Sequence, residues 1–157
     1  MNAPAITLLE ARSLLASSGT TGFRTWEAAL FLGHYLYSAE GQNLVQGKSV
    51  LELGAGTGFL SILCSKHLGA RYVLATDGSG EVVTYLQTNL SLNGLDGGKS
   101  MDTASFLWGH TLVGGALDIN QGNRTYEVVI GADVVRRTTL RNFFLILYQL
   151  LLCCHSL

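Results

Sequence analysis

A glycine-rich turn between an expected strand and an expected helix constrains this chain more than any other feature. Residues 48–53 form a short, mostly apolar run that reads as a strand, and glycines follow it at positions 54, 56 and 58. Residues 59–67 then resume a helical apolar period. Glycine lets the backbone turn sharply and lets a ligand approach the main-chain amides without a Cβ in the way. The turn therefore predicts a nucleotide-like ligand.

The segment after this turn completes a βαβ unit. Residues 71–77 read as a buried strand that ends in Asp77, and residues 81–92 read as a helix that closes at Asn93 and Gly94. Two parallel strands need such a helical crossover, which is almost always right-handed, so we predict an α/β fold. Asp77 follows the glycines by about 20 residues, where an acidic side chain can accept both hydroxyls of a ribose. The alternative is a structural turn followed by a solvated aspartate.

Further elements are expected on both sides of this unit. Apolar spacing predicts three more helices, over residues 6–17, 26–37 and 140–152. Thr25 is the expected N-cap of the second of them. Two more strands are expected over residues 104–108 and 126–132, and the latter is apolar enough to be central in the sheet. A loop is expected over residues 94–100.

Composition excludes several classes of protein. Of the 157 residues, 48% are hydrophobic and 13% are charged, which excludes a disordered chain. The formal net charge of -1 gives no electrostatic footprint for nucleic acid or for an anionic membrane surface. The longest apolar stretch, residues 143–154, is shorter than the about 20 residues that span a bilayer. The scattered histidines and cysteines predict neither a metal site nor a disulfide framework, so we expect a soluble, cytoplasmic protein.

The spacing of the glycines bears on which cofactor the turn takes. Glycines at 54, 56 and 58 give G-x-G-x-G, whereas the dinucleotide fingerprint is G-x-G-x-x-G. Phe59 occupies the place of the last glycine of that fingerprint. A bulky Phe59 and an acidic Glu52 before the turn fit a cofactor without phosphates better than one with two. An NAD-dependent oxidoreductase is therefore the disfavoured alternative.

The motif Glu-Leu-Gly-Ala-Gly-Thr-Gly at residues 52–58 resembles the first motif of the seven-β-strand S-adenosylmethionine-dependent methyltransferases. Together with it, the segments at residues 22–29, 92–94, 108–109 and 131–134 occur in an order similar to that of the family 16 protein-lysine methyltransferases. The Thr-Trp-Glu-Ala-Ala segment at residues 25–29 looks closest to the branch that methylates a lysine of elongation factor 2. The resemblance spans roughly residues 6–135.

The resemblance implies S-adenosyl-L-methionine as cofactor and assigns residues to its site. Asp77 would hold the ribose, Trp108 would cover the adenine, and Trp26 would lie near the sulfonium, where a ring face attracts a cation. Without the resemblance, a tryptophan in either position is more often a residue of the core or its rim than a ligand contact. Glu52 would either approach the methionine end of the cofactor or cap local backbone amides. The implied cofactor-binding residues are Trp26, Glu52, Gly54, Ala55, Gly56, Asp77, Trp108 and Ala132.

The resemblance also implies a catalytic element after the fourth strand. In the family, an Asp-x-x-Tyr element borders the channel for the substrate lysine, and Asp133 matches its first residue. The alternative for Asp133 is a helix cap or a solvated loop acid. Arg136 stands where the family has the aromatic residue, and its permanent charge would repel both a lysine and a sulfonium. We therefore expect impaired catalysis.

The resemblance predicts a Rossmann-like class I methyltransferase fold with three α/β/α layers and a mostly parallel sheet that lacks the C-terminal strands. One domain is expected, made of N-terminal helices with a cofactor lid (1–46), the methyltransferase core (47–135) and a divergent apolar helix (136–157). The expected function is S-adenosylmethionine-dependent methylation of a lysine, with elongation factor 2 as substrate. The alternative is a non-catalytic cofactor-binding or protein-interaction remnant, a fragment that self-associates through an exposed sheet edge.

Overall fold

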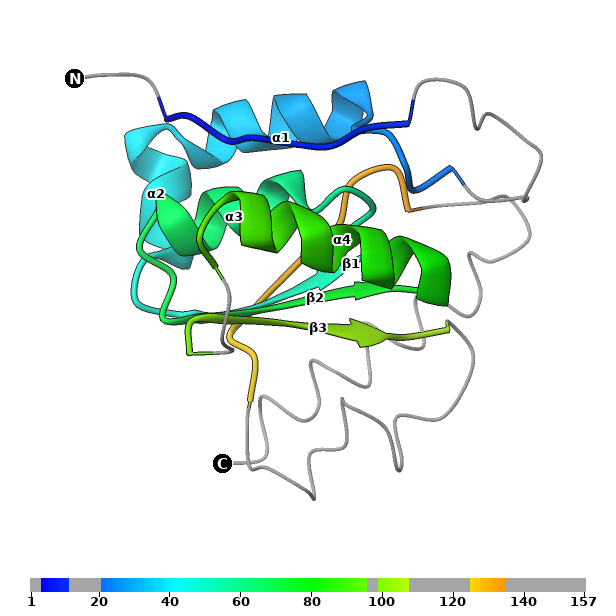
Figure 1. Ribbon diagram of the computed structural model, residues 1–157. Helices are drawn as coiled ribbons and strands as arrows, with labels where there is room; N and C mark the ends of the chain where they lie inside the picture. Colours follow the sequence, from blue (N-terminus) through cyan, green and yellow to red (C-terminus); the bar gives the residue numbers. More distant parts are fainter. Residues whose placement is uncertain (1–3, 12–20, 96–98, 108–124, 135–157) are drawn as a thin grey trace.

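The computed structural model describes residues 4–11, 21–95, 99–107 and 125–134, and within them the chain forms one parallel sheet (Figure 1). The strands are β1 (Ser49–Leu53), β2 (Tyr72–Asp77), β3 (Met101–Ser105) and β4 (Val128–Ile130), in the order β3-β2-β1-β4. All three strand pairs are parallel, which confirms the predicted α/β class. The glycine turn, the crossover helix and the strand ending in Asp77 lie where the sequence predicts them.

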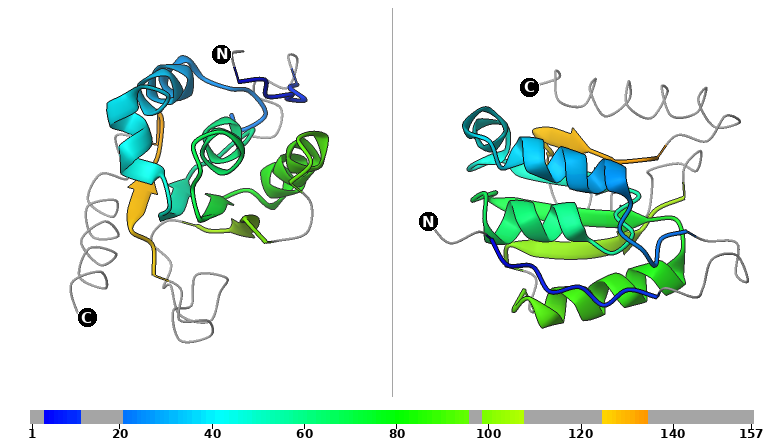
Figure 2. Two further views of the ribbon diagram at one scale, coloured as in Figure 1. Left: turned by 90° about the vertical axis from the view of Figure 1, so that its left-hand side faces the viewer. Right: turned by 90° about the horizontal axis from the view of Figure 1, so that it is seen from above.

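Four helices cover one face of this sheet (Figures 1 and 2). They are α1 (Glu27–Leu36), α2 (Ala39–Val45), α3 (Phe59–Lys66) and α4 (Gly80–Leu92). Because α3 and α4 join strands that succeed one another in the same direction, right-handed crossovers put both helices on the same face. The main hydrophobic core lies between these helices and the sheet and includes Leu36, Val45, Val50, Leu60, Ile62, Val73, Leu86 and Met101.

The opposite face of the sheet carries a second apolar cluster. Leu51, Leu53, Leu74, Ala104 and Phe106 are buried in it. Among the described residues, no helix lies on this face, so they form two of the three predicted layers (Figure 2). The helix predicted over residues 140–152 lies outside the described residues.

The strand predicted over residues 126–132 is shorter than expected. β4 covers three residues and, among the described strands, pairs only with β1, so the described residues do not test whether it is central in the whole sheet. Of its three residues, only Ile130 is buried. Apolar composition measures how readily a strand is buried, but strand order depends on long-range pairing. β3 likewise begins three residues before the predicted start.

The N-terminal region departs most from the predictions. Residues 6–11 carry no helix, so the helix predicted over 6–17 is wrong for this part, and residues 12–17 lie outside the described residues. The helix predicted over 26–37 is α1, but its N-cap is Trp26 rather than Thr25. The sequence reading also missed α2, whose N-cap Ser38 accepts a hydrogen bond from the backbone N–H of Gly41 at 3.2 Å. No helix within the described ranges is long and apolar enough to cross a membrane.

Candidate cofactor site

The turn between β1 and α3 needs glycine for two separate reasons. Gly54, Gly56 and Gly58 have φ angles of 64°, 54° and 83°, in the left-handed region that disfavours side chains. A Cβ on Gly58 would also lie 2.1 Å from Cδ1 of Leu86 on α4, and a Cβ on Gly56 would lie 3.1 Å from the carbonyl oxygen of Gly22. The turn is therefore closely covered by α4 on one side and by the segment around Gly22 on the other.

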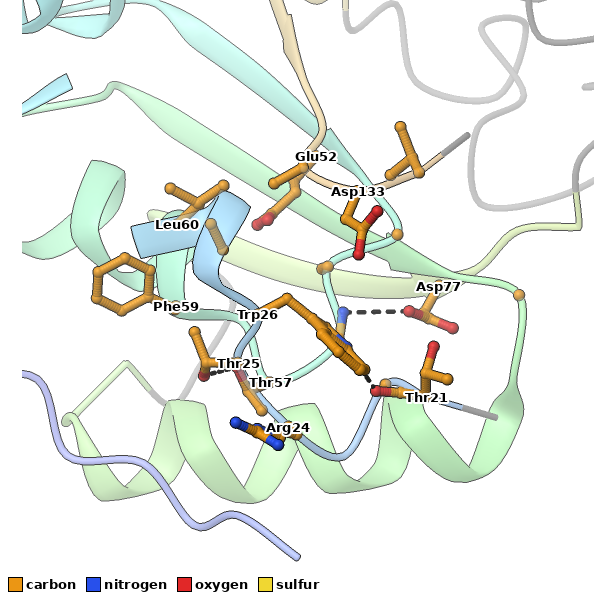
Figure 3. A pocket seen from close by; sticks show the side chains of 18 of the residues that line it. Thr21, Arg24, Thr25, Trp26, Glu52, Thr57, Phe59, Leu60, Asp77 and Asp133 are labelled. Carbon is orange, nitrogen blue, oxygen red and sulfur yellow. Dashed lines mark hydrogen bonds between the residues drawn. The ribbon is translucent and has the colours of Figure 1, made fainter. Parts of the chain in front are cut away.

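Asp77 ends β2 beside this turn, and two backbone amides hold its carboxylate (Figure 3). One oxygen, Oδ2, accepts from the N–H of Gly56 at 3.1 Å, and Oδ1 accepts from the N–H of Ser79 at 3.1 Å. A carboxylate has about four lone-pair sites, so each oxygen keeps one for a further donor. The side chain is thus oriented before any ligand arrives.

Residues 21–26, called the lid below, lie against the glycine turn. The hydroxyl groups of Thr25 and Thr57 are 2.7 Å apart and share a hydrogen bond. Nε1 of Trp26 donates to the carbonyl oxygen of Thr21 at 3.1 Å, and the guanidinium of Arg24 lies 5.6 Å from the Trp26 ring centroid. These bonds orient the indole at the edge of the cavity, where 36% of Trp26 is exposed.

Glu52 lies at the end of β1 beneath the turn and is 3% exposed. Its carboxylate accepts a hydrogen bond from the hydroxyl of Ser61 in the first turn of α3. Burial raises the pKa of Glu52 to about 7 and outweighs the hydrogen bonds that Ser61 donates from its hydroxyl and its backbone N–H. The side chain also borders the cavity, so both roles considered for Glu52 stay predictions.

Asp133 follows β4 and lines the cavity between Glu52 and Asp77 (Figure 3). It is exposed, and its φ of 56° makes it the one non-glycine residue in the left-handed region within the described part of the chain. Aspartate tolerates this conformation better than most side chains do. Its neighbours Ala132 and Val134 also line the cavity, whereas Arg136 lies outside the described residues.

These groups surround one cavity of about 490 Å³ at the carboxyl ends of the strands. Ligands of open α/β sheets bind at this end, where the strand order reverses, and here the order reverses between β1 and β4. Of the predicted site residues, eight line the cavity: Trp26, Glu52, Gly54, Ala55, Gly56, Asp77, Ala132 and Asp133. Trp108 lies outside the described residues. The roles assigned to these residues stay predictions.

Several lining residues were not predicted. Thr57 lies inside the glycine motif and Ser79 two residues after Asp77, so both could have been inferred from their neighbours. Phe106 and Leu107 directly follow β3, and the three-residue error in this strand hid their position at its carboxyl end. Thr21 and Arg24 enter through the lid, whose path no local pattern indicates.

Phe59 explains why the third glycine of the dinucleotide fingerprint is absent. A Cβ on Gly33 of α1 would lie 2.6 Å from the Phe59 ring, so this ring fills the space between α3 and α1. In the dinucleotide fold the same position is a glycine that allows close helix–strand packing beneath a pyrophosphate. The packing here disfavours the oxidoreductase alternative.

Among the described residues, no cluster of three or more His, Cys, Asp or Glu side chains is arranged to hold a metal ion.

Comparison with known proteins relates this geometry to an enzyme family. A family model described as lysine methyltransferase matches residues 12–154. Protein-lysine N-methyltransferase EFM3 of Chaetomium thermophilum is 52% identical over 131 residues, covering 83% of this chain and 38% of that protein. Protein-lysine N-methyltransferase EEF2KMT of Mus musculus is 31% identical over 138 residues, covering 83% of this chain and 39% of that protein.

A crystal structure of ribosomal protein L11 methylase from Lactobacillus delbrueckii subsp. bulgaricus is also similar, with 25% identity and a TM-score of 0.42. The similarity covers 66% of this chain and 43% of that chain. Against the two sequence relatives, the chain spans about two fifths of their length.

Proposed function

This chain belongs to the lysine methyltransferase family, and from that premise we propose that it binds S-adenosyl-L-methionine in the cavity and methylates a lysine of elongation factor 2 in the cytoplasm. Membership confirms the predicted family and, with it, the predicted cofactor. The activity, the substrate and the location are our proposals. Both sequence relatives are named protein-lysine N-methyltransferases, which supports a protein substrate.

The orientation of Asp77 is the observation that carries the proposal. Its two oxygens are already held by the amides of Gly56 and Ser79, at 3.1 Å each. In the proposed complex, the remaining lone pairs accept hydrogen bonds from the two ribose hydroxyls. Because the carboxylate does not need to be ordered on binding, little side-chain entropy is lost when the cofactor arrives.

The charges around the cavity favour a cationic ligand over a phosphorylated one. Among the described residues, three carboxyl side chains line it, from Glu52, Asp77 and Asp133, against one cation, Arg24. Such a lining attracts a sulfonium and repels a pyrophosphate. This balance is a second argument against NAD.

In our proposal Asp133 borders the path of the substrate lysine. It is exposed and lines the cavity, where it lies between Glu52 and Asp77 in Figure 3. A lysine with its usual pKa of about 10.4 is mostly protonated, and only the neutral amine can attack the methyl group. The Asp133 carboxylate would orient the ammonium on entry, and transfer of the methyl group would follow loss of the proton.

The first experiment is calorimetric titration of the chain with S-adenosylhomocysteine. We expect binding by the unmodified chain and a loss of about 100-fold in the Asp77→Ala variant, since two hydrogen bonds to a charged acceptor are removed. Asp102→Ala is the control, because Asp102 is also a strand aspartate that accepts a backbone N–H, at 2.8 Å from Thr103, but it is exposed and does not line the cavity. A folded chain that binds no S-adenosylhomocysteine would refute the proposal.

The substrate is tested by transfer of a labelled methyl group from S-adenosylmethionine. We expect label in purified elongation factor 2 and little label in a cell extract from which that factor has been removed. The support for this substrate is the resemblance of residues 25–29 and the name of the mouse relative. Label in a different protein of the depleted extract would contradict this choice of substrate while leaving the methyltransferase proposal intact.

A non-catalytic cofactor-binding protein is the second candidate, and Arg136 is the observation that favours it. A permanent positive charge stands where the resembled family has an aromatic residue. Replacing it by tyrosine distinguishes the two candidates. Methyl transfer by the unmodified chain would exclude this candidate, whereas activity gained only in Arg136→Tyr would support it.

A further inference from the structure

Residues 4–11, called the strap below, run in extended conformation along α4 (Figure 2). Asn89 of α4 and Asn93, the C-cap of that helix, hold the strap through its backbone. Asn93 accepts from the N–H of Thr7 at 3.0 Å and donates to its carbonyl oxygen at 2.7 Å. Asn89 accepts from the N–H of Leu9 at 2.7 Å and donates to its carbonyl oxygen at 3.3 Å. Each carboxamide thus pairs with one strap residue as a neighbouring strand would.

The spacing of the two asparagines matches the spacing of the strap. Four residues of a helix rise by about 6 Å, and two residues of an extended chain rise by about 6.6 Å. Asn89 and the C-cap Asn93 are four residues apart, and Thr7 and Leu9 are two residues apart on the strap. Side chains alternate along the strap, so Ile6 and Leu8 pack against the hydrophobic core.

The strap is also joined to the lid and to the glycine turn. Besides Leu9, the buried carboxamide of Asn89 donates to the carbonyl oxygen of Thr57 at 2.9 Å. Thr57 shares its hydroxyl hydrogen bond with Thr25 of the lid. The N–H of Thr25 in turn donates to the carboxylate of Glu10 on the strap at 3.0 Å. The hydrogen bonds form a closed circuit from Leu9 through α4, turn and lid to Glu10.

We propose that the strap, held by Asn89 and Glu10, is a latch that positions the lid over the glycine turn and thereby sets the affinity for the cofactor. Neither residue lines the cavity, whereas Thr25 and Thr57, which they hold, both do. Asn89 and Glu10 are therefore positioning residues. The inference rests on the proposed function for its ligand but not for the latch itself, which the hydrogen bonds describe.

Asn93 provides a matched control for Asn89. Both are buried asparagines that pair with one strap residue, Asn89 within α4 and Asn93 as its C-cap. The third bond of Asn93, however, goes to the carbonyl oxygen of Asn89 at 2.7 Å instead of to the turn. We expect both alanine variants to unfold at similarly lowered urea concentrations. The dissociation constant for S-adenosylhomocysteine should rise about tenfold in Asn89→Ala and less than about threefold in Asn93→Ala. Equal rises in the two variants, or none in either, would overturn the latch.

Glu10 allows a test without loss of a buried group, because it is exposed. Glu10→Gln keeps a side-chain oxygen for the Thr25 N–H, and Glu10→Ala removes it. We expect the Thr25 amide to exchange with deuterium faster in Glu10→Ala and at the unmodified rate in Glu10→Gln. Affinity for S-adenosylhomocysteine should fall about threefold in the first variant and be restored in the second.

The two proposals fail in different ways. If the folded, unmodified chain binds no S-adenosylhomocysteine, the proposed function is refuted, and the exchange rate of the Thr25 amide still decides whether the latch holds the lid. If the chain binds and both Glu10 variants exchange and bind like the unmodified chain, the latch is refuted while the cofactor site stands.

Discussion

The two strand-to-helix junctions of the sheet start their helices with different groups. α4 begins behind Ser79, whose hydroxyl accepts from the N–H of Val82 at 3.4 Å. α3 begins behind Gly58, which is left-handed and has no side chain to cap the helix. The carboxyl group of Glu52 instead reaches from the preceding strand to Ser61 in the first turn of α3. One junction is capped locally and the other from a distance.

The difference shows how a fold keeps a helix N-terminus open to a ligand. A local cap would fill the space in front of α3, where the turn lines the cavity. Supplying the cap from β1 leaves that space free, at the cost of a buried carboxyl group. At the β2–α4 junction Ser79 lines the same cavity, and its own hydroxyl caps the helix.

The largest expected effect is at Gly58, because the open junction depends on it. Gly58→Ala forces an alanine to a φ of 83° and its Cβ toward Leu86, and we expect the free energy of unfolding to fall by about 3 kcal/mol. Urea denaturation followed by circular dichroism measures this. A loss below about 1 kcal/mol would mean that the turn relaxes and that the glycine is not structurally required.

Glu52→Gln tests the remote cap through its pH dependence. The pKa of Glu52 is about 7 in the folded chain against 4.5 for the free side chain, so the folded state holds the proton more tightly. The protonated Glu52 side chain contributes fully to the free energy of unfolding below pH 4.5. This contribution, on the order of 3 kcal/mol, is lost as the pH rises through 7. Urea denaturation between pH 4.5 and 8.5 should show this decline in the unmodified chain and not in the variant. Parallel curves would contradict an ionisable cap.

Ser79→Ala tests the local cap at the other junction. We expect the free energy of unfolding to fall by about 1 kcal/mol, because the N–H of Val82 loses its side-chain acceptor. This loss of unfolding free energy should not depend on pH between 4.5 and 8.5, whereas the contribution of Glu52 to the unfolding free energy does. Ser79→Asp, which keeps an acceptor, is the control, and an equal loss in that variant would argue against a capping role.

The smallest effect is expected at Gly80, the first residue of α4. No atom lies within 4 Å of a Cβ built there, and its φ is outside the left-handed region. Gly80→Ala should therefore raise the free energy of unfolding by about 0.5 kcal/mol, by reducing the entropy of the unfolded chain. The variant also serves as the glycine control for Gly58→Ala. If Gly58→Ala and Gly80→Ala destabilised the chain by similar amounts, the claim that glycine is required at the β1–α3 junction and not at the β2–α4 junction would be contradicted.

The strap shows where reading the sequence failed and why. Ile6, Leu8 and Leu9 suit a helical period as well as a strand, and the prediction chose a helix. The choice is decided by Asn89 and Asn93, more than 70 residues away, which supply hydrogen-bond partners to an extended backbone. The same kind of long-range pairing decides that β4 lies beside β1 at the edge of the described sheet.

The sequence by itself determined the βαβ unit, the glycine turn and Asp77 at the end of β2, because each depends on residues next to one another in the chain. A strand followed by left-handed glycines and a helix is encoded within about ten residues. Only the tertiary structure decided that Glu52 ionises near pH 7, that the lid covers the turn and that the strap joins them. Burial and hydrogen bonding between distant segments set these properties, and neither can be read from local spacing.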